Sequence, residues 1–278
     1  MDYHEIRWVC ALKAEAIPII EYLKMSRTNQ NSPFEIYKDS TEKNWLVVSG
    51  IGQVNAAAAA INLHYLSGSS KWAVWVNLGI AGGHIGAYGS FFLVDNVTQA
   101  GTNLTFYLTH AKGIREKRAG LLTVDKVNSQ YDDNLLFDME GGGFVQAVTK
   151  LVSKELIVVL KIISDGPKFP IQALTRDKIS DLVRQNMNSI EDTVSKFLPL
   201  ARIERDRLFR PEILNEILGQ WKFSETQVNQ LESLVNRVCV AKETLDWYEE
   251  IKHSKSSRDV IFFLKNALKS YQTDWSKS

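Results

Sequence analysis

Short apolar runs rich in valine, isoleucine, leucine and aromatic residues recur along the first 165 residues of the chain and predict β-strands. Several runs are apolar on consecutive positions instead of alternating, which is typical of a strand covered on both faces. The predicted strands comprise residues 8–12, 45–49, 72–78, 91–97, 104–109, 121–127 and 156–163.

Helical patterns lie between some of these strands, at residues 15–24, 55–66 and 143–154. Strands that alternate with helices predict an α/β fold, in which helices cover the faces of a central sheet. The consecutive strand-like runs between residues 91 and 127 indicate that part of the sheet is antiparallel. The sheet is therefore expected to be mixed.

The pattern changes after Asp165. Residues 176–198 carry apolar side chains at spacings of three and four, which predicts a long amphipathic helix. An arginine-rich segment, RIERDRLFR, follows between Pro199 and Pro211 and is interpreted as a connector with a solvated face.

The remainder of the chain predicts helices. A capping-box pattern from Ser224 to Gln227 begins a helix that continues to about Tyr248, and a last helical segment spans residues 259–275. We therefore divide the chain into an α/β domain, residues 1–200, and a helical extension, residues 201–278. The extension is expected either to pack onto the α/β domain or to join subunits.

Composition narrows the class of protein. With 45% apolar residues the chain can bury a large core, and 33 Lys and Arg against 32 Asp and Glu leave a formal charge of +1. Such a balance favours neither nucleic acid nor an anionic membrane as a partner. The chain has only two cysteines, and no apolar run approaches the ~20 residues of a membrane span. Its N-terminus is unlike a signal peptide. These features predict a cytoplasmic protein.

Two glycine-rich segments follow apolar strands. In SGIGQVNA, residues 49–56, the glycines would let a ligand approach backbone N–H groups at a helix N-terminus. A dinucleotide site would need an acidic residue about 20 positions further on, but the next strand ends at Asn77, so a simple tight turn is the better interpretation. The second segment, NLGIAGG at residues 77–83, indicates close approach by a ligand or by another part of the chain.

Charged residues mark three further positions. Glu140 precedes a helix that glycines open, where a carboxylate is favoured by the helix dipole and can accept hydrogen bonds from a vicinal diol. Lys161 and Asp165 end the most apolar strand and lie on one face while that strand stays extended. Either an ion pair or a polar active site would explain them. Glu15 lies just beyond the first predicted strand. Taken by itself, it would be interpreted as an acidic residue in the first turn of the helix that follows.

In this order the motifs resemble the family of purine nucleoside phosphorylases and nucleosidases, in particular its methylthioadenosine/S-adenosylhomocysteine nucleosidase branch. The resemblance rests on ALKAEA, SGIGQVNAA, NLGIAGG, DMEGG and LKIISD, and it covers residues 6–198. It implies a three-layer α/β/α fold with a central mixed sheet, and an enzyme that cleaves the N-glycosidic bond of a nucleoside. It does not extend to the helical extension.

The resemblance implies a role for each charged residue. Asp165 would be the general acid that protonates N7 of the purine. Glu140 would bind the 2′ and 3′ hydroxyls of the ribose, and Glu15 would orient or deprotonate the attacking water. Lys161, in the same machinery, is expected to turn toward Glu15 or Glu140. Met139 would pack against the sugar.

The resemblance also implies the remaining pocket residues, which are Ile80, Ala81, Gly82, Ser164 and Val127. An aromatic lid that stacks on the base is common in this branch, and Tyr131 and Phe169 are the candidates for it here. No metal or other cofactor is expected, because the five histidines are scattered singly along the chain.

Water is the predicted nucleophile. Phosphorylases of this family hold phosphate with arginines near the first motif and before the third-strand glycines, and ALKAEAIPII and VWVNLGIAGG contain none. A phosphate-dependent phosphorylase remains the alternative within the same reaction class.

The sequence departs from the nucleosidase pattern in three ways. Ile80 stands where those enzymes carry a hydroxyl residue, Lys161 replaces an expected arginine, and Gly166 and Pro167 follow Asp165 where a second acid is common. Ile80, Lys161 and the short segment between Val127 and Asp138, in which no lid is identifiable, motivate a second hypothesis, a catalytically silent nucleoside-binding protein that works through its helical extension. The expected partners are a small purine nucleoside and further copies of the chain, because this family usually forms dimers or larger rings.

Overall fold

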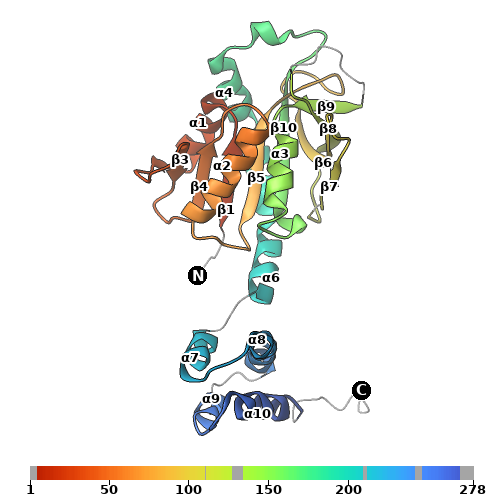
Figure 1. Cartoon of the computed structure of the whole chain (residues 1–278). Coiled ribbons are helices and arrows are strands. Elements are labelled where there is room, and N and C mark those ends of the chain that lie inside the picture. The colour runs from red at the N-terminus through yellow and green to blue at the C-terminus, as the bar shows by residue number, and fades with distance from the viewer. Residues whose placement is uncertain (1–4, 110, 127–133, 209–211, 242–245, 270–278) are drawn as a thin grey trace. The chain divides into compact units, whose positions relative to one another are not determined.

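The computed structural model describes residues 5–109, 111–126, 134–208, 212–241 and 246–269, and the chain divides into two compact units, Met1–Arg207 and Leu208–Ser278 (Figure 1). The larger unit is α/β and the smaller one is helical. Helix α6 (Leu198–Leu208) contains residues 202–208 of the predicted connector, which the sequence did not predict as helical, and none of these residues is buried. A helix is possible because Pro199 lies in its first turn, where the backbone nitrogen needs no intrahelical partner.

Four parallel strands form the centre of the larger unit. They are β1 (Ile6–Cys10), β4 (Asn44–Val48), β5 (Val74–Gly83) and β10 (Ile157–Asp165), adjacent in the order β10, β5, β1, β4. Their carboxyl ends share one edge of the sheet, where open α/β sheets bind ligands.

Six further strands complete a ten-stranded mixed sheet. Strand β6 (Phe91–Gln99) runs antiparallel to β10, and β8 (Lys117–Thr123) and β9 (Leu135–Asp138) follow parallel to it. Strand β9 also pairs with the end of β5 at Gly82 and Gly83. The five strands β5, β10, β6, β8 and β9 therefore close into a ring. The ring brings β9 and the segment after it to the carboxyl ends of β5 and β10. Strand β3 (Glu35–Lys38) lies between β4 and the edge strand β2 (Ser26–Arg27), and β7 (Thr105–Tyr107) pairs with β6.

Helices cover both faces of the sheet. On one face α2 (Gln53–Leu66) and α3 (Gly141–Val148) lie side by side (Figure 1). On the other, α1 (Lys13–Tyr22) packs against α4 (Arg176–Gln185), which leads into α5 (Met187–Ser195). Two short 3₁₀ turns, Lys154–Leu156 and Ile171–Ala173, complete this unit. The predicted α/β/α fold with a central mixed sheet is confirmed.

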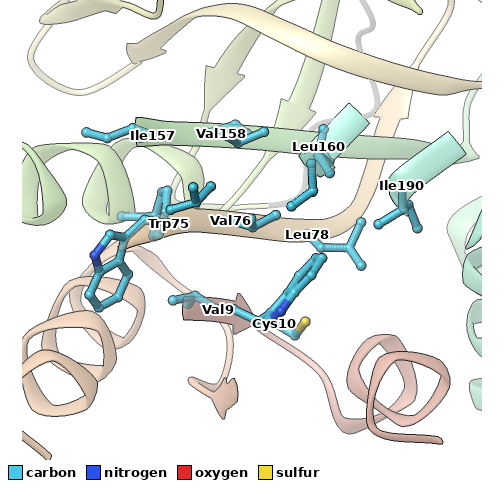
Figure 2. Close-up of a cluster of buried hydrophobic side chains, with 14 of the residues drawn as sticks. Val9, Cys10, Trp75, Val76, Leu78, Ile157, Val158, Leu160 and Ile190 are labelled. Atoms are coloured by element: carbon cyan, nitrogen blue, oxygen red, sulfur yellow. The ribbon is translucent and has the colours of Figure 1, made fainter. Parts of the chain in front are cut away.

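The core lies between the sheet and both helix layers. Side chains of β1, β5 and β10 meet at its centre, among them Val9, Val76 and Val158 (Figure 2). Every residue of β10 is buried, as its consecutive apolar positions predict. Polar groups at the end of such a strand are therefore held in a dry environment.

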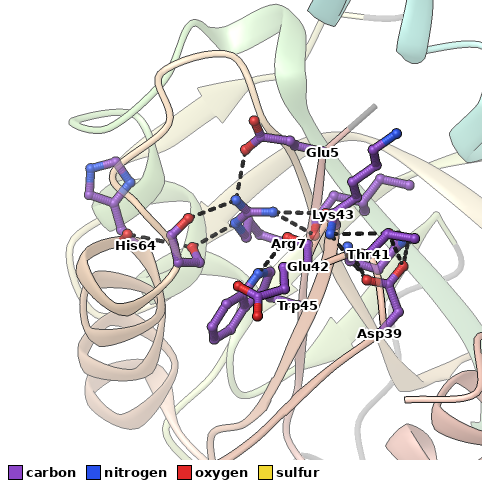
Figure 3. Close-up of polar contacts among 11 residues, drawn as sticks. Glu5, Arg7, Asp39, Thr41, Glu42, Lys43, Trp45 and His64 are labelled. Atoms are coloured by element: carbon purple, nitrogen blue, oxygen red, sulfur yellow. Dashed lines mark hydrogen bonds and ion pairs between the residues drawn. The ribbon is translucent and has the colours of Figure 1, made fainter. Parts of the chain in front are cut away.

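A buried arginine holds the opposite, amino-terminal edge of the sheet (Figure 3). The guanidinium of Arg7 donates to Oε2 of Glu5 at 2.8 Å, to the carbonyl of Lys43 at 2.9 Å, and to the hydroxyl of Ser67 at 2.6 Å. Burial lowers the pKa of Arg7, and the neighbouring Glu5 carboxylate opposes that effect. These bonds tie β1 to the loop before β4 and to the end of α2.

The predicted helix 176–198 divides in two at Asn186. The side-chain Nδ2 of Asn186 donates to the carbonyl of Leu182 at 2.8 Å and to that of Gly89 at 3.2 Å. The first bond caps α4 and the second ties its end to the loop before β6, and α5 begins after the same residue. Strands β2, β3 and β9 were not predicted from the sequence, because each has only two to four residues.

The smaller unit has its own hydrophobic core, to which all four of its described helices contribute. The helices are α7 (Glu212–Gln220), α8 (Glu225–Ala241), α9 (Asp246–Ile251) and α10 (Ser257–Lys269). The capping box is confirmed, since the Ser224 amide donates to Gln227 Oε1 at 2.9 Å and the Gln227 amide to Ser224 Oγ at 3.4 Å. Among the described residues, no helix is both long and apolar enough to cross a membrane.

Candidate active site

A cavity of about 210 Å³ opens at the carboxyl ends of β1, β5 and β10. Side chains from several segments that are distant in sequence line it, and most of the lining is apolar. The lining residues are Ala11, Leu12, Glu15, Ile51, Ile80, Ala81, Gly82, Val124, Phe137, Asp138, Met139, Glu140, Ser164, Asp165, Ile171, Leu174 and Ile179.

Glu15 fills the gap that opens where β1 and β5 separate. Its Oε1 accepts the Ile80 amide at 2.9 Å and its Oε2 accepts the Leu12 amide at 2.8 Å, and the residue is only 2% exposed. The Ile80 amide is available because β1 pairs with β5 only as far as Asn77. Burial raises the pKa of Glu15 to about 7, against the lowering effect of these two hydrogen bonds.

Glu140 follows β9 and lies against the first turn of α2. Its Oε1 accepts the backbone amide of Gly52 at 2.9 Å. Burial raises the pKa of Glu140, while the charge of Lys161 acts in the opposite direction. The carboxylate therefore occupies the N-terminus of α2 that a dinucleotide phosphate would need, which argues against the dinucleotide interpretation.

The glycines of the SGIGQVNA and DMEGG motifs make this arrangement possible. Gly50 and Gly52 adopt positive φ angles of 81° and 107° in the turn between β4 and α2. Gly143 packs so closely on the first turn of α2 that a Cβ atom there would lie 2.0 Å from the Gln53 carbonyl oxygen. Both motifs thus serve to bring Glu140 to the start of α2.

Asp165 ends β10 after a β-bulge. The pairing of β10 with β5 shifts register between Ile163 and Asp165, so Ser164 is the extra residue. The expectation of an unbroken strand, with Lys161 and Asp165 on one face, was therefore wrong. The Ser164 hydroxyl donates to Oδ1 of Asp165 at 2.6 Å, and both residues line the cavity.

Lys161 lies beneath the cavity and pairs with an acid that the sequence analysis did not single out. Its Nζ is 2.8 Å from Oδ2 of Asp138, and the charges of Glu140 and Glu15, toward which it was expected to turn, also act on it. Burial alone would lower the pKa of Lys161, but the carboxylates of Asp138 and Glu140 outweigh it and raise that pKa. Asp138 also accepts the Thr123 hydroxyl at 2.7 Å and the Gly141 amide at 2.8 Å.

Gly79 provides the space between the charged groups. It pairs with Lys161 across the β5–β10 ladder. A Cβ atom at this position would lie 3.0 Å from Oε1 of Glu15 and 3.3 Å from Nζ of Lys161. The first glycine of the NLGIAGG motif is therefore explained by close packing of these two charged side chains against the strand.

Most of the predicted site residues lie together. The three acids Glu15, Glu140 and Asp165 border one cavity. Val127 and Tyr131 lie outside the described residues. Phe169 packs against Tyr88 with ring centroids 5.2 Å apart and lines a neighbouring hollow that Asp165 also borders. The pocket residues Met139, Ile80, Ala81, Gly82 and Ser164 line the cavity with the acids.

The sequence analysis missed one wall of the cavity. Ile171, Leu174 and Ile179, which follow β10, form an apolar surface beside the acids, and Ile51 adds to the lining. Only Ile179 carried a signal, as part of the apolar face of the predicted helix 176–198. The others are single apolar residues in irregular segments, which no periodicity marks.

The sheet order, the helix layers and the acids at the carboxyl ends define a protein with the nucleoside phosphorylase/nucleosidase fold. The resemblance found in the sequence is thus confirmed at the level of the fold. No protein-family model matches the chain, and a search of the curated proteins finds no match either.

Solved structures make the fold assignment specific. The chain is similar to a 5′-methylthioadenosine/S-adenosylhomocysteine nucleosidase from Helicobacter pylori, with a TM-score of 0.56, 13% identity, and coverage of 70% of this chain and 100% of that one. The apo 5′-methylthioadenosine nucleosidase of Arabidopsis thaliana matches with a TM-score of 0.56 and 18% identity, over 72% of this chain and 97% of that one. A futalosine hydrolase mutant from Helicobacter pylori matches with a TM-score of 0.53 and 12% identity, over 69% of this chain and 99% of that one.

Proposed function

We propose that the chain is a purine nucleosidase that hydrolyses the N-glycosidic bond of an adenine nucleoside, such as methylthioadenosine, S-adenosylhomocysteine or 5′-deoxyadenosine. One observation carries this proposal: Glu15, Glu140 and Asp165 are far apart in the sequence but line one cavity. Cleavage of a purine from ribose requires a proton for the departing base, a hold on the sugar and an activated nucleophile. The three acids can supply one function each.

Asp165 acts on the base. It donates its proton to N7 as the bond between C1′ and the purine nitrogen breaks and the bonding electron pair passes into the ring. The hydrogen bond that Ser164 donates to Oδ1 helps to hold this carboxyl group at the cavity wall. The sugar meanwhile develops oxocarbenium character, which nearby carboxylates stabilise.

Glu140 and Glu15 act on the sugar and the water. Glu140 accepts hydrogen bonds from the 2′ and 3′ hydroxyls, with Met139 packed beside the ribose. Ionised Glu15 accepts a proton from the water whose oxygen bonds to C1′. Because Ile80 and Leu12 both donate to Glu15, its position is fixed without recruiting another side chain.

The lining of the cavity favours water over phosphate as the nucleophile. Among the described residues that line it there are four acids and no Lys, Arg or His. A phosphate dianion would meet repulsion and no bidentate partner there. Hydrolysis is therefore better supported than phosphorolysis.

The same lining favours an uncharged 5′ substituent. Ile171, Leu174 and Ile179 offer apolar contacts but no partner for a carboxylate or a phosphate. Methylthioadenosine and 5′-deoxyadenosine therefore fit this wall better than S-adenosylhomocysteine does, because its amino-acid group would be desolvated.

The direct test incubates the full chain with each of these nucleosides, with and without phosphate, and measures free purine by chromatography. We expect adenine release that does not depend on phosphate. Asp165→Asn should abolish it, while Asp177→Asn, an exposed acid in the first turn of α4, should leave it unchanged. Failure of all three nucleosides to release adenine under both conditions would contradict the proposal.

The second hypothesis, a silent nucleoside-binding protein, is motivated by Ile80, Lys161 and the absence of an identified lid. It predicts tight binding of a nucleoside without turnover. Calorimetric titration separates the two, since affinity that is unchanged in Asp165→Asn, together with no adenine release by the native chain, would favour binding alone.

A homo-oligomer is also proposed, on the strength of one exposed helix face. Ile51, Val54, Ala58, Ile61 and Tyr65 form an apolar stripe along α2, in which Val54 is 82% exposed. Ile51 also lines the cavity, so a second copy seated on this stripe would help to enclose the substrate. Light scattering should show a dimer or larger assembly that Val54→Glu disrupts and Asn188→Glu, on exposed α5 surface, does not.

A further inference from the structure

The first two amides of α3 are capped by side chains from two neighbouring strands. The Gly141 amide donates to Oδ2 of Asp138 at 2.8 Å. The Gly142 amide donates to Oγ1 of Thr123 at the same distance. Thr123 and Asp138 are the last residues of β8 and β9, pair across the ladder, and are joined by a 2.7 Å hydrogen bond from the Thr123 hydroxyl to Oδ1 of Asp138. Both are buried, so the start of α3 is capped by the two strands that precede it.

Glu140 stands at the N-cap position of α3, yet its side chain makes no capping hydrogen bond there. The side chain of an N-cap residue ordinarily accepts the amide of the second or third residue of its own helix. In α3 the amide of the second residue, Gly142, is already taken by Thr123. Oε1 of Glu140 instead accepts the Gly52 amide at 2.9 Å, and Glu140 lines the cavity. The caps from the two strands thus leave the Glu140 side chain to the cavity and not to its own helix.

Lys161 compensates the charge of Asp138 beside Glu140. Its Nζ is 2.8 Å from Oδ2 of Asp138, the same oxygen that accepts the Gly141 amide. Burial has the largest effect on the pKa of Glu140 and raises it, the charge of Lys161 lowers it, and the charge of Asp138 raises it further. The lysine therefore offsets the repulsion that a capping carboxylate exerts on Glu140.

We propose that Thr123 and Asp138 are positioning residues for ribose recognition, because they cap α3 in place of Glu140 and leave its carboxylate to the 2′ and 3′ hydroxyls. The inference rests on the proposed function, in which Glu140 holds the ribose. Thr123 is not among the described residues that line the cavity, so it acts on the sugar only through α3 and Glu140. Loss of its hydroxyl would leave the buried Gly142 amide without an acceptor, and the N-cap carboxylate of Glu140 is placed to supply one.

The test measures binding of two nucleosides that differ only in the two hydroxyls, adenosine and 2′,3′-dideoxyadenosine. Calorimetric titration of the full chain carrying Asp165→Asn gives both affinities without turnover. Adding Thr123→Val, which replaces the hydroxyl by a methyl group of similar size, should weaken adenosine binding about tenfold, because the hold on the diol is lost. Its effect on 2′,3′-dideoxyadenosine should be less than twofold. Adding Thr123→Ser, which keeps the hydroxyl, should restore the affinity for adenosine.

The matched control is Thr149→Val, which removes a hydroxyl at the other end of the same helix and should change neither affinity. Circular dichroism checks folding, and Thr123→Ala removes the same hydroxyl with less bulk should Thr123→Val not fold. An equal loss of affinity for both nucleosides would overturn the inference, since damage to the fold does not distinguish them. An unchanged affinity for adenosine, or no binding of adenosine, would overturn it too. Absence of adenine release by the native chain would reject the proposed hydrolysis instead, which this comparison of affinities does not require.

Discussion

The Nζ atom of Lys161 lies 2.8 Å from Oδ2 of Asp138, and each side chain is only 1% exposed. The pair lies beneath a cavity bordered by Glu15 and Glu140, whose charges also act on Lys161. The lysine is therefore the buried counter-charge for a group of acids. It is not among the described residues that line the cavity.

Removal of either partner should destabilise the larger unit. Lys161→Met or Asp138→Asn leaves a buried charge or polar group without compensation, at a cost of about 3 to 5 kcal/mol. Urea unfolding measures this loss. The double variant should cost less than the sum of the two single variants, and additive costs would contradict the direct pairing.

The rate of nucleoside hydrolysis should decrease as the pH falls below about 7. Burial raises the pKa of Glu15 to about 7, and only its ionised form can accept a proton from water. The pH dependence of kcat/KM for methylthioadenosine measures this acidic limb. Glu15→Gln should lower kcat by a factor of ~10² to 10⁴. Glu21→Gln, on the exposed end of the same helix, should remain active.

Glu15 should also make stability depend on pH. Because its folded pKa, about 7, exceeds the value of 4.5 in the unfolded chain, its stabilising contribution is complete below about pH 4.5 and is lost as the pH rises through 7. Between pH 5 and pH 8 the native chain should lose roughly 2 to 3 kcal/mol that Glu15→Gln does not lose. Urea unfolding of both proteins at the two pH values tests this, and a constant difference would contradict it.

The acids of the candidate site could be predicted from local patterns. Glu15 and Asp165 follow strand-like runs, and parallel strands bring their carboxyl ends to one edge of the sheet, while Glu140 precedes a helix that glycines open. The order of the motifs then pointed to one family. Local sequence therefore contained most of what places these three side chains.

The partner of Lys161 could not be predicted in this way. Asp138 lies in β9, a four-residue strand whose position depends on closure of the five-stranded ring. The bulge at Ser164 could not be predicted from the sequence either, because an inserted residue leaves the apolar pattern of β10 unchanged. Both features arise from pairing between distant strands, which periodicity along one segment does not report.

Gly79→Ala should impair catalysis more than folding. The new methyl group would lie 3.0 Å from Oε1 of Glu15, which must move to avoid it. Misplacement of a general base by a fraction of an ångström should lower kcat about tenfold to a hundredfold. Gly101→Ala is the control, since its methyl group would have no atom nearer than 3.8 Å. Equal kcat values for both variants would show that Glu15 does not depend on this contact.

Removal of the helical unit should leave the nucleosidase activity intact. All described cavity residues lie between Ala11 and Ile179, within the larger unit, and the hydrophobic core of that unit ends at Ala201 and its neighbours in α6. A chain that ends after Leu208 should therefore fold and release adenine with unchanged kcat. Circular dichroism and the chromatographic assay check both points.

The helical unit should in turn fold alone. Its twelve buried apolar residues, among them Trp247, Leu214 and Val260, form a core separate from that of the larger unit. Residues 208–278 should therefore show a cooperative thermal transition as an isolated fragment. Leu231→Ala, which removes a fully buried side chain from α8, should lower its stability by about 2 to 5 kcal/mol. Phe262→Ala, at an exposed position of α10, should leave it nearly unchanged. A non-cooperative transition would mean that this unit needs the α/β unit to fold.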